Sequence, residues 1–340
     1  MARCGSQCFL CDLPIRFDTY NGCSHACEYC FAKKFVDISK IKKDETAKNL
    51  RNFIEGRRGP EVCWCDWDIP IHWGGMSDPF QPVEKKIRNS YECLKVFAET
   101  QYPFVVSTKG KLIIEDDYLD LISKCNCVVQ ISVVCASYDK METGAPSFEE
   151  RLHMASVLSK KVKRVIVRIQ PYMHEVFDEV YNNLERFKKA GVYGVIVEGM
   201  KFKKMKPGLV KVNGDYTYPY QLIKADFLKL REKAHSLGLK IYSGENRTRI
   251  YGDSLTCCGI DGLEGFIPNK FNLNHLCNGD KQEPTEKMKE ENTGLAFKTL
   301  SMDTPNTRRL GKNSFAFNMI DLYKNRRDLV EDTFGIKERK

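Results

Sequence analysis

The chain has 340 residues, of which 42% are hydrophobic and 29% charged, and its formal net charge is +9. It contains no run near the roughly 18 apolar residues that span a bilayer, which argues against a membrane protein. Its first residues lack the apolar core of a signal peptide, so we expect a cytoplasmic protein without a membrane partner. The moderate positive charge permits a phosphate-bearing partner such as nucleic acid but does not require one.

Residues 1–12 carry Cys4, Cys8 and Cys11, and we predict that they form a cysteine-containing extension in front of the fold. The whole chain has 15 cysteines, which is many for a cytoplasmic protein. Disulfides are disfavoured in the cytoplasm, so clustered cysteines indicate metal binding. These three thiols are candidates for an auxiliary iron–sulfur cluster or zinc. The alternative is that they are reduced thiols that pack as small hydrophobic groups.

A second cysteine triplet follows the first predicted strand, residues 15–19. Cys23, Cys27 and Cys30 have the spacing C-x3-C-x2-C. Three thiolates so placed can hold three corners of a [4Fe–4S] cluster and leave the fourth iron without a protein ligand. An open iron is reactive because a cofactor or substrate can chelate it. Structural zinc usually takes four protein ligands, and a zinc knuckle is the alternative to the cluster.

From residue 70 onward, short apolar runs alternate with amphipathic stretches. Apolar runs of four to eight residues indicate strands buried on both faces, and repeated strand–helix units indicate a parallel sheet. With the first strand this gives six or seven units, fewer than the eight of a closed barrel. The predicted strands are residues 70–73, 104–107, 127–134, 165–169, 192–197 and 239–242, and the predicted helices are residues 83–100, 115–124, 147–160, 178–190 and 221–237.

Two arginines and one serine in this region have local explanations that compete with ligand binding. Ser147 is a predicted helix N-cap, with Glu150 three residues later completing a capping box. Arg151 either donates two hydrogen bonds to a ligand carboxylate or pairs with an acidic side chain near its helix. Arg168 lies in a buried strand, where an unpaired charge is costly, so we expect an anionic partner. Glu198 is a candidate for that partner or for substrate binding.

After about residue 245 the composition changes to Gly, Asn, Asp and Cys with only short apolar runs. We predict a C-terminal extension over residues 246–340 that caps the substrate and carries a candidate auxiliary metal site. Its cysteines either complete the site begun by the first triplet or form a separate one, and they are Cys257, Cys258 and Cys277.

The cysteine loop resembles the signature of the radical S-adenosylmethionine (SAM) superfamily, which has C-x3-C-x2-C with an aromatic residue, here Tyr29, before the third cysteine. The wider stretch from Phe17 to Lys33 is similar to the spore photoproduct lyase-like branch, and so are residues 77–84, 108–109 and 142–152. The resemblance covers about residues 13–260. It implies an α/β fold with a partial (β/α)6 TIM-type barrel over residues 13–245.

The resemblance also implies the cofactors and partners. These are a [4Fe–4S] cluster on Cys23, Cys27 and Cys30, SAM, and a cellular one-electron reductant of the flavodoxin or ferredoxin type. In the family, a glycine-rich segment after the second strand contacts the methionyl amino group, and hydroxyl and basic side chains at the strand tips suit a carboxylate or ribose. The residues that we predict to bind the cofactor are Gly74, Gly75, Ser77, Asp78, Ser107, Lys109, Gln130, Ser132, Arg151 and Arg168.

The implied reaction begins with one-electron reduction of the cluster. SAM then splits into methionine and a 5′-deoxyadenosyl radical, which abstracts a hydrogen atom from the substrate, while the protein orients the substrate and excludes water and oxygen. Three hypotheses remain open at this point. The protein is a lyase, repair or base-modifying enzyme that acts on nucleic acid, an enzyme that modifies a peptide or small metabolite, or a non-catalytic iron–sulfur or zinc protein that binds nucleic acid.

Overall fold

The fold is built on one parallel sheet. The computed structural model describes residues 11–57, 69–212, 214–270 and 272–279, together with Glu331, Gly335 and Lys337. All neighbouring strands of the main sheet run parallel. The strands, in spatial order, are β1 (Arg16–Phe17), β4 (Ile71–Trp73), β5 (Phe104–Thr108), β6 (Cys127–Ser132), β7 (Arg164–Tyr172), β8 (Gly194–Gly199) and β11 (Lys240–Ser243).

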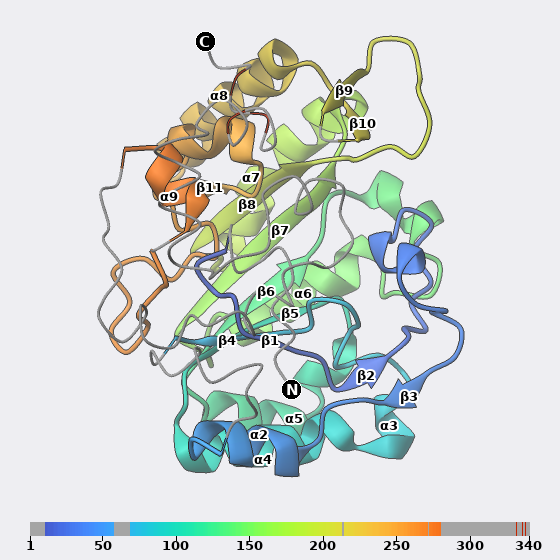
Figure 1. The fold of residues 1–340 in the computed structure, drawn as a ribbon, viewed down its shortest axis with the longest axis vertical. Helices are drawn as coiled ribbons and strands as arrows, with labels where there is room; N and C mark the ends of the chain where they lie inside the picture. Colours follow the sequence, from blue (N-terminus) through green and yellow to red (C-terminus); the bar gives the residue numbers. More distant parts are fainter. Residues whose placement is uncertain are drawn as a thin grey trace, which may run out of the picture.

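Because the spatial order follows the chain order, right-handed crossovers put the connecting helices on one side of the sheet and leave the other side concave (Figure 1). Within the described residues β1 and β11 are the two edges and do not pair with each other, so the barrel is open, as predicted. The helices are α2 (Ala47–Ile54), α3 (Glu84–Ile87), α4 (Asn89–Thr100), α5 (Asp116–Ser123), α6 (Phe148–Leu158), α7 (Phe177–Lys189), α8 (Tyr220–Ser236) and α9 (Leu273–Cys277).

The predicted helix over residues 83–100 is two helices, because Arg88 between α3 and α4 has φ = 53°. The break lets the fully buried Glu84 carboxylate accept hydrogen bonds from the first N–H groups of α4, those of Ser90 (3.0 Å) and Tyr91 (2.8 Å). The Tyr118 hydroxyl also donates to Glu84, at 2.8 Å. By contrast, α6 begins as predicted, with Ser147 and Glu150 forming a capping box.

Two short antiparallel pairs lie at the carboxyl edge of the sheet, meaning the edge where the parallel strands end. One joins β2 (Tyr20–Asn21) to β3 (Lys42–Lys43) and encloses the cysteine loop. The other joins β9 (Val210–Val212) to β10 (Asp215–Thr217). An ion pair of 3.1 Å between Lys34 and Asp215 connects the two. This ion pair links the turn that follows the cysteine loop to the β9–β10 pair, and we call this part of the carboxyl edge the rim.

Residues 258–261 of the C-terminal extension pack at the amino edge, where the strands begin. Arg164, the first residue of β7, donates to the carbonyls of Gly259 (3.0 Å) and Asp261 (2.8 Å). Cys258 and Ile260 belong to the same buried core as the sheet. The proposed division at residue 245 stays a prediction, and Cys4, Cys8 and residues 280–330 lie outside the described residues. In the described part of the chain, no helix combines the length and apolar character needed to cross a bilayer.

Candidate active site

The cysteine loop is fixed at the carboxyl edge by backbone contacts from several segments. Cys23 N donates to Ile38 O at 2.9 Å, and Glu28 N donates to Met141 O at 2.9 Å. Gln81, which follows β4, accepts from Ser24 N at 2.8 Å. These hydrogen bonds fix the backbone of the loop on both sides, and none of them involves a sulfur atom.

Gly144 packs directly beneath this loop. A Cβ atom at position 144 would lie 2.5 Å from Ser24 O and 2.7 Å from His25 O, closer than such contacts are found. The His25 ring joins the same region, because its Nδ1 lies 2.8 Å from Gly144 O. The loop and the turn at residue 144 are therefore in direct backbone contact.

Asp78 connects the cysteine loop to the ends of β4 and β5. Its carboxylate accepts from Thr108 Oγ1 (2.7 Å) and Lys109 N (2.6 Å), and it lies 3.2 Å from His25 Nε2. Burial alone would raise the pKa of Asp78, but the charge of His25 and these hydrogen bonds lower it to about 2. The Asp78 carboxylate therefore has protein partners on several sides, while its predicted contact with the cofactor stays a prediction.

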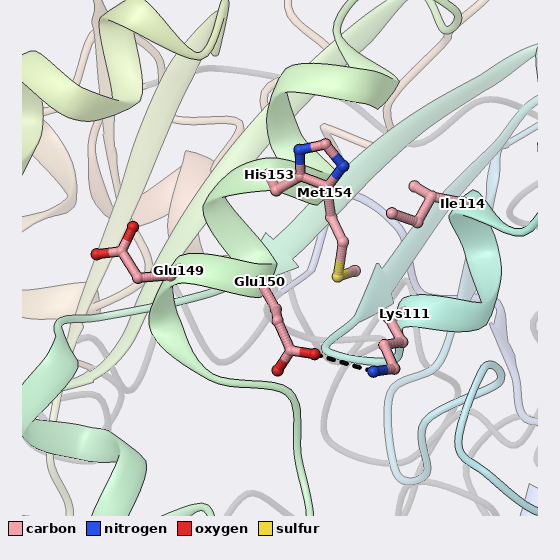
Figure 2. Close-up of a pocket in the computed structure, with 6 residues that line it drawn as sticks. All are labelled: Lys111, Ile114, Glu149, Glu150, His153 and Met154. Atoms are coloured by element: carbon pink, nitrogen blue, oxygen red, sulfur yellow. Dashed lines mark hydrogen bonds and ion pairs between the residues drawn. The ribbon is translucent and has the colours of Figure 1, made fainter.

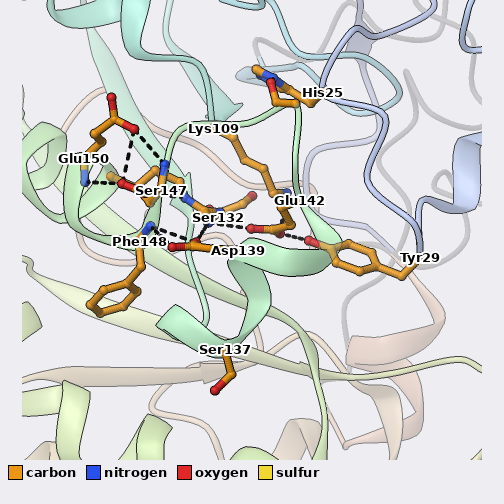
Figure 3. A network of polar contacts seen from close by, with 12 residues as sticks. His25, Tyr29, Lys109, Ser132, Ser137, Asp139, Glu142, Ser147, Phe148 and Glu150 are labelled. Atoms are coloured by element: carbon orange, nitrogen blue, oxygen red, sulfur yellow. Dashed lines mark hydrogen bonds and ion pairs between the residues drawn. The ribbon is translucent and has the colours of Figure 1, made fainter.

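A buried ion pair lies next to the cysteine loop (Figure 3). Arg151 is fully buried and pairs with Glu142 at 2.5 Å, while its Nη1 donates to Ser132 O at 2.8 Å. The Tyr29 hydroxyl donates to the same Glu142. Burial raises the pKa of Glu142, and the charge of Arg151 opposes that effect. Of the two roles left open for Arg151, the structure shows pairing with acidic side chains; Ser132 contributes its carbonyl.

Lys109 points toward the cysteine loop from the end of β5. Its Nζ lies 3.8 Å from Glu142 Oε1, and its side chain is 15% exposed. Burial lowers the pKa of Lys109, while the nearby Cys27, Asp78 and Cys23 act in the opposite direction. Lys109 is thus a partly accessible cation beside two of the three thiols.

A row of polar side chains crosses the concave face from β4 to β8. Arg168 Nη1 donates to Ser107 Oγ (2.9 Å) and Gln130 Oε1 (3.1 Å). His72 Nε2 lies 3.0 Å from the same Ser107 oxygen. At the other end Arg168 donates to Gln170, whose amide donates to Glu198 at 2.7 Å. We call these residues, His72, Ser107, Gln130, Arg168, Gln170 and Glu198, the concave row.

The surroundings of Arg168 differ from the prediction that it has an anionic partner. Among the described residues no carboxylate lies within ion-pair distance of Arg168, and Glu198 reaches it only through Gln170. The Nε atom of Arg168 is buried and has no hydrogen-bond partner among the residues that the structure describes. The sequence reasoning missed His72 because a histidine in an apolar strand resembles a core residue. Burial, followed by the charges of Arg168 and Arg16, lowers the pKa of His72 to about 3, so this ring is neutral at physiological pH.

The glycines and Ser77 after β4 are packed against neighbouring strands. A Cβ at Gly74 would lie 2.4 Å from Ser107 O, and one at Gly75 would lie 2.7 Å from the Arg16 side chain. The Ser77 hydroxyl donates to Tyr20 O at 2.5 Å and is buried. These residues bring the tips of β1, β4 and β5 together, while their predicted contact with a cofactor stays a prediction.

The loop offers three thiols as donors. Thiolates are ligands of iron–sulfur clusters and of zinc, and in a cubane cluster each thiolate binds a different iron. Within the described ranges, no group of three His, Cys, Asp or Glu side chains is arranged to hold one metal ion. The assignment of Cys23, Cys27 and Cys30 to a cluster stays a prediction.

One hollow of the structure lies away from the cysteine loop. A groove of about 350 Å³ is formed between the 3-10 turn η3 (Lys111–Ile114) and α6, on the outer helical layer (Figure 2). Its polar lining includes Glu149, His153 and the ion pair between Lys111 and Glu150. None of the predicted cofactor-binding residues lines this groove, so we do not assign it to the active site.

Comparison with solved structures gives the fold. The structure is similar to spore photoproduct lyase in complex with the dinucleoside spore photoproduct, with a TM-score of 0.55 and 16% sequence identity over 68% of this chain and 77% of that chain. A variant of that lyase with bound AdoMet and the same dinucleoside gives a TM-score of 0.53 at 16% identity, over 68% and 76% of the two chains. The chain has the fold of spore photoproduct lyase.

The sequence relatives of this chain are distant. No family model matches the chain. An uncharacterised protein of Mycobacterium tuberculosis is 25% identical over 207 residues, which is 56% of this chain and 60% of that protein. An uncharacterised protein of Methanocaldococcus jannaschii is 22% identical over 176 residues, or 48% and 61% of the two chains. The matches thus span about three fifths of the length of these curated relatives.

Proposed function

We propose that the protein is a radical SAM enzyme whose [4Fe–4S] cluster is held by Cys23, Cys27 and Cys30. The observation that carries this proposal is the three-cysteine loop anchored at the carboxyl edge of a radical SAM fold, the edge where such sheets have their active sites. When the cluster and SAM are bound, one-electron reduction by a cellular reductant cleaves SAM and supplies a 5′-deoxyadenosyl radical that takes a hydrogen atom from the substrate.

The described side chains have separate tasks in this proposal. Lys109 supplies a positive charge beside the loop, suited to the carboxylate of SAM. Ser107 and Gln130 offer polar groups on the concave face, and Arg168 has an unpaired Nε donor there. His72 is neutral at physiological pH, so it serves as a hydrogen-bonding group rather than a charge. Asp78 and the Arg151–Glu142 pair keep the loop in place.

For the substrate we propose nucleic acid, on the basis of the rim around the cysteine loop. Phe31 and Phe35 are 52% and 59% exposed, and Met205 is 59% exposed. Basic side chains interleaved with exposed rings are typical of surfaces that bind a phosphate backbone and stack bases. We call the exposed lysines of this region the basic rim: Lys33, Lys34, Lys40, Lys42, Lys43, Lys201, Lys203, Lys204, Lys206 and Lys211.

Reductive SAM cleavage tests the enzymatic proposal. After anaerobic reconstitution and reduction with dithionite, we expect the wild-type protein to form 5′-deoxyadenosine. The triple variant Cys23→Ala, Cys27→Ala, Cys30→Ala should form none, whereas Cys125→Ala, a buried cysteine at the end of α5, should retain the activity. If a wild-type sample with an intact, reduced cluster forms no 5′-deoxyadenosine, the proposal is wrong and a binding protein becomes the better hypothesis.

A further inference from the structure

Two arginines, Arg16 and Arg168, lie on the concave face although their strands, β1 and β7, are not neighbours. Arg16 and His72 are direct partners in the pairing of β1 with β4, so their side chains lie on the same face of the sheet. His72 Nε2 lies 3.0 Å from Ser107 Oγ, and Arg168 Nη1 donates to that same oxygen at 2.9 Å. Strand register and hydrogen bonds therefore place Arg16 at the β1 end of the concave row.

The guanidinium of Arg168 is held in place by amide and hydroxyl groups rather than by a carboxylate. Its Nη1 donates to Ser107 and Gln130, and its Nη2 donates to Gln170. The Gln130 amide is itself fixed, because its Nε2 donates to Cys258 O at 2.9 Å. A guanidinium has more N–H donors than these contacts use. Among the residues that the structure describes, the Nε–H and one Nη2–H of Arg168 have no acceptor, so they are left for a further oxygen.

Arg16 brings a second positive charge to the same face. A Cβ atom at Gly75 would lie 2.7 Å from Arg16 Cδ, so the arginine side chain extends toward the carboxyl edge. In the described part of the chain its ion pair is with Asp18, at 3.4 Å. The other carboxylate oxygen of Asp18 accepts from the N–H groups of Met76 and Ser77. The Arg16 side chain is 17% exposed, so it is not sealed in the core.

The charges on this face favour an anion. No carboxylate of the described ranges lies within ion-pair distance of Arg168, and Glu198 contacts Gln170 instead, at 2.7 Å. The uncharged state of His72 agrees with a positive environment, because burial, followed by the charges of Arg168 and Arg16, lowers its pKa to about 3. A partly buried cation without a counter-ion is costly, and an anionic group of a ligand offsets that cost.

In the proposed function, SAM does not supply this anion. Its one carboxylate is placed beside Lys109, at the cysteine loop. Its sulfonium and ammonium groups make the whole molecule a cation, which a row of positive charges repels rather than attracts. The anionic group therefore belongs to the substrate.

We propose that Arg16 and Arg168 bind a phosphate group of the substrate on the concave face. The Nε–Nη2 edge of a guanidinium matches two oxygens of a phosphate, which is why arginine is frequent in phosphate sites. The inference rests on the proposed function, which takes nucleic acid as the substrate. In nucleic acid this group is the phosphodiester of the nucleotide that reaches the concave face, in addition to the phosphates that the basic rim contacts.

A pair of dinucleotides tests the proposal by binding alone. One has its natural phosphodiester, and the other has an uncharged methylphosphonate in its place. We expect the anaerobically reconstituted wild-type protein to bind the phosphodiester about tenfold more tightly in isothermal titration calorimetry, as one charge-assisted contact provides. Arg168→Gln and Arg16→Gln should each lose most of this preference. Arg186→Gln, whose exposed side chain pairs with Glu149 on the helical layer, is the matched control and should keep it.

Circular dichroism shows whether each variant is folded. If Arg168→Gln unfolds, Arg168→Lys retains the charge without the paired donors and should lose part of the preference. Equal binding of the two dinucleotides by the wild-type protein, or no binding of either, overturns the proposal. So does an Arg168→Gln protein that loses SAM binding and keeps the dinucleotide preference, because the arginine then serves the cofactor. Formation of 5′-deoxyadenosine by the wild-type protein is measured separately, so the enzymatic proposal can hold while this one fails.

Discussion

Cysteines lie in two different settings in this structure. At the carboxyl edge three thiols come from one short loop, with the partly exposed Lys109 beside them. Cys11 and Cys258 instead come from segments separated by 247 positions, and both pack with the buried core of the sheet. Access and surrounding charge thus differ between cysteines in ways that their spacing in the sequence does not predict.

Breaking the buried ion pair between Arg151 and Glu142 should cause the largest loss of stability. Arg151→Met leaves Glu142 buried without its partner, and we expect a loss of about 3–5 kcal/mol in the free energy of unfolding. The matched control is Arg51→Met, whose partner Glu99 is 64% exposed and whose loss should cost no more than about 1 kcal/mol. Urea denaturation measures both. Equal losses would mean that the pair does not anchor the cysteine loop.

Lys109→Ala tests whether the carboxyl edge binds the cofactor. Losing one charge-assisted hydrogen bond of about 1.5–3 kcal/mol should raise the KM for SAM by roughly 10- to 100-fold. Lys111→Ala, two residues along and paired with exposed Glu150, is the control and should leave KM unchanged. An unchanged KM in Lys109→Ala would remove the lysine from the proposed cofactor site.

The pH dependence of stability tests whether the His72 ring on the concave face is uncharged. Its pKa in the folded protein, about 3, lies below the unfolded value of about 6.5, so between these values the unfolded state binds the extra proton. Stability should therefore fall as pH drops through this window. From pH 7 to pH 5, wild type should lose up to about 2 kcal/mol more than His72→Gln in urea denaturation. Equal losses of unfolding free energy in the two proteins would contradict a neutral His72 ring.

Lysines of the basic rim should contribute more to nucleic-acid binding than lysines at the amino edge of the sheet. Alanine at Lys203, Lys204 and Lys206 removes three candidate phosphate contacts, so binding to a single-stranded oligonucleotide should weaken about tenfold and depend less steeply on salt. Alanine at Lys160, Lys161 and Lys163, exposed residues at the amino edge, is the matched control. Fluorescence anisotropy measures both triples, and equal weakening would argue against a binding surface at the rim.

The strands could be predicted from the sequence because apolar runs mark strands covered on both faces, and the cysteine loop because its spacing is specific. The break at Arg88 escaped prediction because it accompanies the burial of Glu84, whose carboxylate also accepts a hydrogen bond from Tyr118 in a later helix. For Arg151 the sequence could not choose between a ligand and an acidic partner, since Glu142 approaches it only after the intervening turn has folded. The hydrogen bond from Asn272 to Asp12 likewise depends on the fold that brings these two distant segments together.

The contact between Gly144 and the cysteine loop has a consequence for how this protein tolerates change. Even one added methyl group would press on the carbonyls of Ser24 and His25. In a library randomised over residues 143–145 and selected for function, position 144 should return glycine almost exclusively, while its neighbours vary. Any redesign of this turn must therefore keep Gly144 and place new side chains at the neighbouring positions.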